Sequence, residues 1–73
     1  MRRIPIVLDT TSNVTEFVQI CSTVPGKVCL VDDEGHRVNA KSLLGCIYSS
    51  IEWKSVYVET EEDMAGKIVK FLK

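Results

Sequence analysis

The sequence predicts an α+β fold in which one antiparallel sheet carries its helices on a single face. Short apolar stretches rich in β-branched residues are separated by segments with helical periodicity. The predicted order is strand, helix, two hairpin strands, short helix, strand, helix, which buries its apolar faces best as a four-stranded antiparallel sheet with three helices on one face. A chain of 73 residues has room for one domain, residues 1–73, and one modest core.

The first strand is expected over residues 4–8, where Pro5 suits the start or edge of a strand because it lacks an amide donor. A cluster of cap and turn residues follows at 9–13, and Asn13 with Glu16 has the spacing of a capping box. A helix over roughly 13–23 is predicted by four apolar residues at positions i, i+3, i+4 and i+7: Val14, Phe17, Val18 and Cys21.

Pro25 and Gly26 end that helix. Residues 27–31 and 36–38 are expected to be strands joined by the polar turn 32–35, which makes a β-hairpin. A short helix follows from about 41 to 49, and residues 55–59 alternate as a fourth strand should.

The last predicted element is a helix capped by Thr60, with Asp63 completing a variant capping box. Gly66 weakens this helix by about 1 kcal/mol relative to alanine. Its core face has the spacing i, i+4, i+7, i+8 and comprises Met64, Ile68, Phe71 and Leu72.

The composition excludes several classes of function. Nine basic and ten acidic residues are mixed along the chain, for a net charge of −1, which argues against binding to nucleic acid or to an anionic membrane. Apolar runs are too short for a transmembrane helix or a signal-peptide core. Because the sequence offers no glycine-rich phosphate loop, metal-site spacing or nucleophile–base pair, we expect a non-catalytic protein without cofactor or metal. Three widely spaced cysteines, Cys21, Cys29 and Cys46, are expected to be core residues in a reducing cytoplasm.

Residues 38–45 say most about function. Asn39 and Ser42 are both N-cap residue types, and either can satisfy a backbone N–H of a following helix. Leu43 and Leu44 are adjacent and therefore point about 100° apart on a helix, so we expect one of them to face outward. A serine at the positive end of a helix beside an exposed leucine predicts a docking patch controlled by phosphorylation.

The octet Val-Asn-Ala-Lys-Ser-Leu-Leu-Gly at 38–45, with its flanking hairpin and a match that continues to Ile47, resembles the HPr family. These are small phosphocarrier and regulatory proteins of the bacterial sugar phosphotransferase system. The resemblance implies an HPr-like open-faced β-sandwich with the element order β-α-β-β-α-β-α. It also implies that Ser42 corresponds to the regulatory serine that an ATP-dependent HPr kinase phosphorylates.

In the family, the surface around that serine meets the kinase/phosphorylase, Enzyme I, permease domains and a transcriptional regulator. The resemblance therefore implies that these protein partners dock on Lys41, Leu43, Leu44 and Ile47. We also expect Lys41 to be an intramolecular partner for a phosphate on Ser42. The oligomeric state stays open.

The histidine motif of the family is missing. An HPr phosphocarrier accepts its phosphoryl group on a histidine between the first strand and the first helix, in a motif that also supplies glycine and arginine. Residues 9–13 here read Asp-Thr-Thr-Ser-Asn, and the only histidine, His36, falls in the hairpin, where we expect a solvated or partner-facing side chain. A lost histidine with a kept serine is similar to the catabolite-repression paralogue of HPr, a regulator that cannot carry phosphohistidine.

Two alternatives from other classes remain. One is a structural or oligomerising module that reuses the HPr fold and in which Ser42 is silent. The other is a phosphocarrier with a non-standard acceptor, for which His36 is the sole imidazole candidate.

Overall fold

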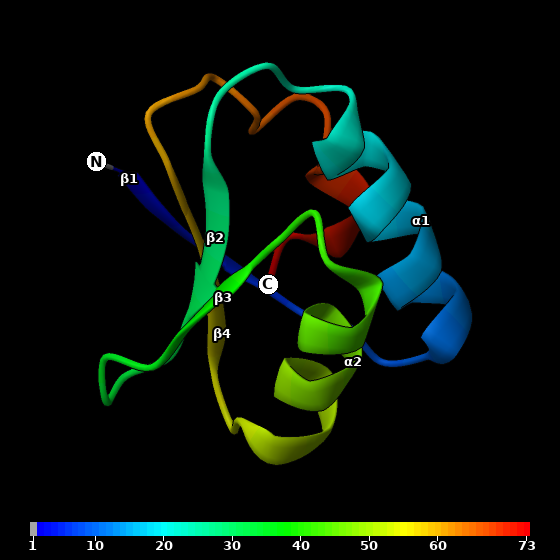
Figure 1. The fold of residues 1–73 in the computed structure, drawn as a ribbon, viewed down its shortest axis with the longest axis vertical. Helices are drawn as coiled ribbons and strands as arrows, with labels where there is room; N and C mark the ends of the chain where they lie inside the picture. Colours follow the sequence, from blue (N-terminus) through cyan, green and yellow to red (C-terminus); the bar gives the residue numbers. More distant parts are fainter. Residues whose placement is uncertain (1) are drawn as a thin grey trace.

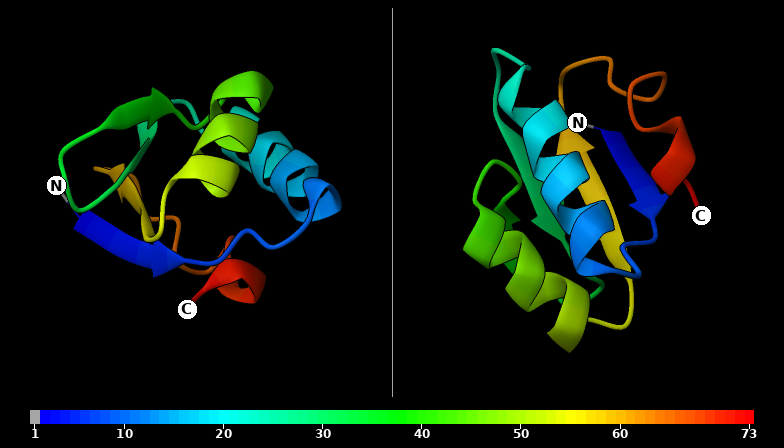
Figure 2. Two further views of the ribbon diagram at one scale, coloured as in Figure 1. Left: turned by 90° about the horizontal axis from the view of Figure 1, so that it is seen from below. Right: turned by 90° about the vertical axis from the view of Figure 1, so that its right-hand side faces the viewer.

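The structure is a computed structural model that describes residues 2–73. Within these residues, four antiparallel strands form one open sheet and two α-helices lie on one of its faces (Figures 1 and 2). The elements are β1 (Arg2–Ile6), α1 (Thr11–Ser22), β2 (Val28–Val31), β3 (Arg37–Asn39), α2 (Leu43–Glu52), β4 (Val56–Thr60) and the 3₁₀ helix η1 (Val69–Phe71). The predicted α+β class and four-stranded antiparallel sheet are therefore confirmed.

The strand order in the sheet is β1-β4-β2-β3, so the last strand of the chain lies between the first two. In the register of β4, Val58 pairs with Ile4 of β1 on one side and with Leu30 of β2 on the other. The edges of the sheet are β1 and the short strand β3. Helix α1 packs against α2, and α2 packs against β3. Buried residues of α1 share one core with β2 and β4, and Figure 2 shows both helices on the same side of the sheet.

Alternation along the strands divides the sheet into a core face and an open face. Toward the helices, β2 and β4 present Val28, Leu30, Val56 and Val58, all of them buried. Helix α1 contributes Val14, Phe17 and Cys21 to this core, as its helical spacing predicts. The ring of Phe17 meets that of Phe71 edge to face, with 5.6 Å between the ring centroids, a geometry that aromatic pairs prefer.

Helix α1 begins earlier than its predicted capping box. Thr10 is the N-cap, because its Oγ1 accepts a hydrogen bond from the backbone N–H of Asn13 at 3.1 Å. The predicted cap at Asn13 is wrong. Asn13 is instead inside the first turn, and the threonine hydroxyl satisfies its amide.

The third predicted α-helix does not form. After β4 the chain makes turns, and only Val69–Phe71 are helical, in a 3₁₀ turn. The predicted cap residue Thr60 serves a turn: its Oγ1 donates to the carbonyl of Lys27 at 2.9 Å and accepts from the N–H of Glu62 at 3.0 Å. The core residues predicted for the helix, Met64, Ile68 and Phe71, are nonetheless buried, whereas Leu72 is exposed.

Hydrogen bonds to the first strand explain why this segment is not a helix. The N–H of Val7 donates to the carbonyl of Phe71 at 2.8 Å, and the N–H of Lys73 donates to the carbonyl of Pro5 at 3.1 Å. Ile6 and Leu72 form an antiparallel bridge. Residues 71–73, where the chain leaves the 3₁₀ turn, thus pair with residues 5–7 and satisfy backbone groups there that a continued helix would leave unpaired.

Candidate docking site along helix α2

A polar turn fixes the start of α2. The carboxamide Oδ1 of Asn39 accepts the backbone N–H of Lys41 at 2.9 Å, and the N–H of Ser42 donates to the carbonyl of Asn39 at 3.0 Å. Such a side-chain-to-backbone bond two residues on is typical of asparagine in turns. The two candidate cap residues therefore have different roles: Asn39 stabilises the turn and Ser42 caps the helix.

Ser42 is the N-cap of α2. Its Oγ accepts a hydrogen bond from the backbone N–H of Gly45 at 3.3 Å, and its carbonyl accepts from Cys46 at 3.0 Å. Ser42 is half-buried, and the first turn of α2 contains no acidic residue. A phosphate on this hydroxyl would lie at the positive end of the helix dipole, without a neighbouring carboxylate in that turn to repel it.

Gly45 packs closely against the preceding strand. A Cβ added there would lie 3.4 Å from Cβ of Val38 and 3.5 Å from Oγ of Ser42. The small residue thus lets the first turn of α2 approach β3.

The side chain of Lys41 already forms a hydrogen bond within the protein. Its Nζ donates to the carbonyl of Val24 at 2.5 Å, which links the start of α2 to the loop after α1. The expectation that Lys41 pairs with a phosphate on Ser42 would require it to give up this hydrogen bond.

The two adjacent leucines are both exposed, Leu43 to 42% and Leu44 to 80%. Ile47, also predicted to dock a partner, is only partly exposed and packs against the core. Two further apolar residues that the sequence reasoning missed are exposed on the same helix, Tyr48 to 56% and Ile51 to 72%. The helical spacing i, i+4, i+7 from Leu44 through Tyr48 to Ile51 could have revealed them.

We call Leu44, Tyr48 and Ile51 the α2 stripe. The opposite side of α2 faces the core with Cys46 and Ser49, and the only charged residue of the helix is its last, Glu52. A solvated surface helix normally carries charged residues on its outer face. The uncharged outer face of α2 therefore has the character of a contact surface.

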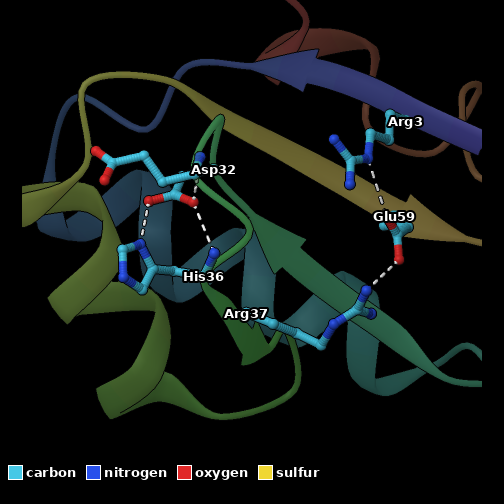
Figure 3. A network of polar contacts seen from close by, with 6 residues as sticks. Arg3, Asp32, His36, Arg37 and Glu59 are labelled. Atoms are coloured by element: carbon cyan, nitrogen blue, oxygen red, sulfur yellow. Dashed lines mark hydrogen bonds and ion pairs between the residues drawn. The ribbon is translucent and has the colours of Figure 1, made fainter.

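The hairpin turn holds an ion pair that lies beside the end of α2. His36 Nδ1 lies 2.8 Å from Oδ2 of Asp32, as Figure 3 shows. The His36 ring also stacks on that of Trp53, with 6.3 Å between centroids and 27° between planes. The sequence predicts a solvated or partner-facing side chain for His36. Its side chain is largely exposed, but it is paired within the protein on both sides.

This ion pair shifts the pKa of both His36 and Asp32. The hydrogen bond to Asp32, and then the charge of Asp32, raise the pKa of His36. Partial burial would raise the pKa of Asp32, but the hydrogen bonds from the His36 side chain and from the backbone of His36 and Glu34 outweigh it and lower that pKa. The pair is therefore favoured in its charged form.

A cleft of about 370 Å³ separates the hairpin turn from the end of α2. We call it the hairpin cleft. Its lining includes one residue of the α2 stripe, Tyr48. The remaining lining residues are mostly polar or charged: Asp32, Asp33, Glu34, His36, Glu52, Trp53, Lys54 and Ser55.

A second polar cluster occupies the open face of the sheet. Glu59 is only 6% exposed, and its two carboxylate oxygens accept from Arg37 Nη2 at 2.7 Å and Arg3 Nε at 3.0 Å. Figure 3 shows Glu59 between the two guanidinium groups. The hydrogen bond from Arg37, then that from Arg3, lowers the pKa of Glu59 although burial opposes the shift.

The cysteines take two kinds of position. Cys21 and Cys46 are buried in the core, where burial raises the pKa of the Cys21 thiol to about 12 and that of Cys46 to about 11. Cys29 is only partly buried and lies opposite Glu59 in the β-ladder. All three are free within residues 2–73. The expectation of core residues thus holds for Cys21 and Cys46, and less well for Cys29.

The start of α1 offers hydroxyl groups but no imidazole. Thr10 caps the helix there. His36 belongs to the turn between β2 and β3, and this turn lies at the left of Figure 1, away from the start of α1. Among residues 2–73 we find no cluster of histidine, cysteine and acidic side chains that could hold a metal ion. No helix in the same range has the length and apolar character needed to span a membrane.

Comparison of the chain with protein-family models, with curated proteins and with solved structures gave no match. The class of protein therefore follows from the fold and the site alone. It is a small α+β domain with an open four-stranded sheet and an uncharged, exposed helix face headed by a capping serine.

Proposed function

We propose that this protein is an HPr-like regulatory domain of the phosphotransferase system or of carbon catabolite control. It carries no phosphohistidine, works in the cytoplasm and docks partner proteins along α2 under the control of phosphorylation at Ser42. The partners are an HPr kinase/phosphorylase, and a transcriptional regulator or phosphotransferase-system proteins.

One observation carries the proposal: Ser42 caps α2 directly before its exposed apolar residues, Leu43 and the α2 stripe. Phosphorylation there adds a charge of about −1.5 to −2 at the edge of this surface. It therefore changes what the surface can bind more than it changes the fold. The order of the first six elements and the lack of histidine in residues 9–13 also support the proposal.

Incubation with an HPr kinase and ATP, followed by intact-mass measurement, tests the proposal. We expect one added phosphate on the wild-type protein and none on Ser42→Ala. Ser12→Ala removes another exposed serine, in the first turn of α1, and should accept phosphate like the wild type. An unmodified wild type, or equal modification of Ser42→Ala, would contradict the proposal.

The two alternatives make different predictions. A structural or oligomerising module predicts self-association through the exposed face of α2 and no phosphate on Ser42. A phosphocarrier predicts an acid-labile phosphate derived from phosphoenolpyruvate on His36, whose Nδ1 is already hydrogen-bonded to Asp32.

A further inference from the structure

The α2 stripe and the hairpin cleft form one continuous surface. Tyr48 belongs to both, because it is exposed on the outer face of α2 and also lines the cleft. From Leu44 to Ile51 the stripe rises by seven residue steps, or roughly 10 Å at 1.5 Å per residue. A partner that lies along the stripe therefore reaches the cleft at the end of α2.

The two parts of this surface differ in charge. The stripe is uncharged, whereas the cleft is lined by four carboxylates and by two groups that can be cationic. One of those two groups, His36, is already paired with Asp32. The three other carboxylates, those of Asp33, Glu34 and Glu52, belong to exposed residues, and Lys54 is the other cation. The cleft thus keeps an excess of negative charge beside the rings of Tyr48 and Trp53.

Carboxylates beside aromatic rings favour a cationic side chain, which gains from both the charge and the faces of the rings. We infer that the α2 stripe and the hairpin cleft together bind a helix of a partner protein whose apolar face continues into lysine or arginine residues. This inference rests on the proposed docking along α2 and names the chemistry of the partner. It does not depend on phosphorylation.

A second copy of this chain fits the surface less well. Two antiparallel α2 helices packed through their stripes would place each cleft near the start of the other α2. The cation there is Lys41, which already donates to the carbonyl of Val24. Charge complementarity therefore favours a different, basic chain over self-association.

The test uses the isotopically labelled full chain and two synthetic helical peptides. One peptide carries leucines at i, i+4, i+7 followed by lysines, and the other carries glutamates in place of the lysines. We expect the lysine peptide to shift the NMR signals of Tyr48, Ile51, Glu52 and Glu34, and the glutamate peptide to shift them far less. Added salt should weaken binding of the lysine peptide.

Two sets of variants locate the contacts. Glu34→Gln combined with Glu52→Gln should weaken binding of the lysine peptide about fivefold, since exposed ion pairs are individually weak. Glu61→Gln combined with Glu62→Gln removes the same charge from the loop after β4 and should leave binding unchanged. Tyr48→Ser should abolish most of the binding, whereas Val69→Ser, at another exposed apolar residue, should not.

Several results would overturn the inference. These are no shift with the lysine peptide, equal shifts with both peptides, or equal losses in the two pairs of charge variants. Shifts of α2 signals with protein concentration alone would show that a second copy occupies the surface. Ser42→Ala should bind the lysine peptide like the unphosphorylated wild type, so this result is independent of whether the kinase modifies Ser42.

Discussion

His36 Nδ1 and Asp32 Oδ2 lie 2.8 Å apart across the turn between β2 and β3. The other carboxylate oxygen of Asp32 accepts the backbone N–H groups of Glu34 at 3.0 Å and His36 at 2.8 Å. One nearly buried side chain therefore fixes both the turn and the imidazole. The imidazole in turn stacks on Trp53, so the hairpin is linked to the end of α2.

We predict that Asp32→Asn lowers the pKa of His36 toward its ordinary value of 6.5. In the wild type the pKa of His36 is raised, so while Asp32 is ionised the interaction stabilises the fold fully below pH 6.5 and is lost as the pH rises through the raised pKa. An NMR titration of the His36 ring protons measures the shift. Denaturant unfolding at pH values on either side of the raised pKa measures the loss of stability.

The control for this prediction is Glu34→Gln. Glu34 acts on His36 only through its charge, the smallest of the contributions to the raised pKa, so this variant should titrate almost like the wild type. A wild-type His36 that titrates at or below its ordinary value would refute the ion pair.

Glu59→Gln should remove an acid-sensitive part of the stability. The pKa of Glu59 lies below its ordinary value of 4.5 because Arg37 and Arg3 bind its carboxylate. Its contribution is therefore present above that ordinary value and is lost as the pH falls through the lowered pKa. Urea unfolding should show the wild type more stable than Glu59→Gln at pH 7 and the difference disappearing in acid. Glu61→Gln, at an exposed position, should show no such pH dependence.

Phe71→Ala tests whether the C-terminal segment is part of the core. Phe71 is 2% exposed and packs against Phe17, and truncation of a buried phenylalanine costs about 3–5 kcal/mol. We expect a loss of that size in the free energy of unfolding measured with denaturant. Val69→Ala changes an exposed neighbour and should stay within about 0.5 kcal/mol of the wild type. Equal effects of the two substitutions would show that the segment does not pack as described.

Ser42→Ala should lower the free energy of unfolding by about 1 kcal/mol, because the amide of Gly45 loses its capping acceptor. Ser42→Asp should restore that loss, since aspartate is an equally good cap and its charge suits the helix dipole. Thermal unfolding of the three proteins measures both effects. If Ser42→Ala were as stable as the wild type, the hydroxyl would be free of a capping role.

Much of the fold follows from local sequence patterns. The strands and α1 were predicted because β-branched stretches and the spacing of Val14, Phe17 and Cys21 are visible over a few residues. The prediction of a final helix is wrong, because its apolar residues have helical spacing but are buried without forming an α-helix. Met64, Ile68 and Phe71 are buried by a turn and a 3₁₀ helix. The bridge between Ile6 and Leu72 that holds this segment joins residues far apart in the sequence, so a pattern over a few neighbouring residues cannot predict it.

The candidate site was predicted in part. The cap role of Ser42 and the exposure of Leu44 follow from residue type and helical geometry. Tyr48 and Ile51 were missed because the motif ended at Ile47, although the helix continues to Glu52. The pairing of His36 with Asp32 has an i, i+4 spacing, but it belongs to a hairpin turn, where spacing alone does not predict contact.

The position of β1 has a consequence for folding during synthesis. The partner strand of β1 is β4, which ends at Thr60, the partner of Arg2. On the other edge of β1, Ile6 forms a bridge with Leu72. Ile6, the last residue of β1, pairs with Val56, so a ribosome that has made β1 must add about fifty further residues before this strand meets the first residue of its neighbour. This edge of the sheet therefore depends on contacts between the two ends of the chain, which makes it a late and slow step of folding.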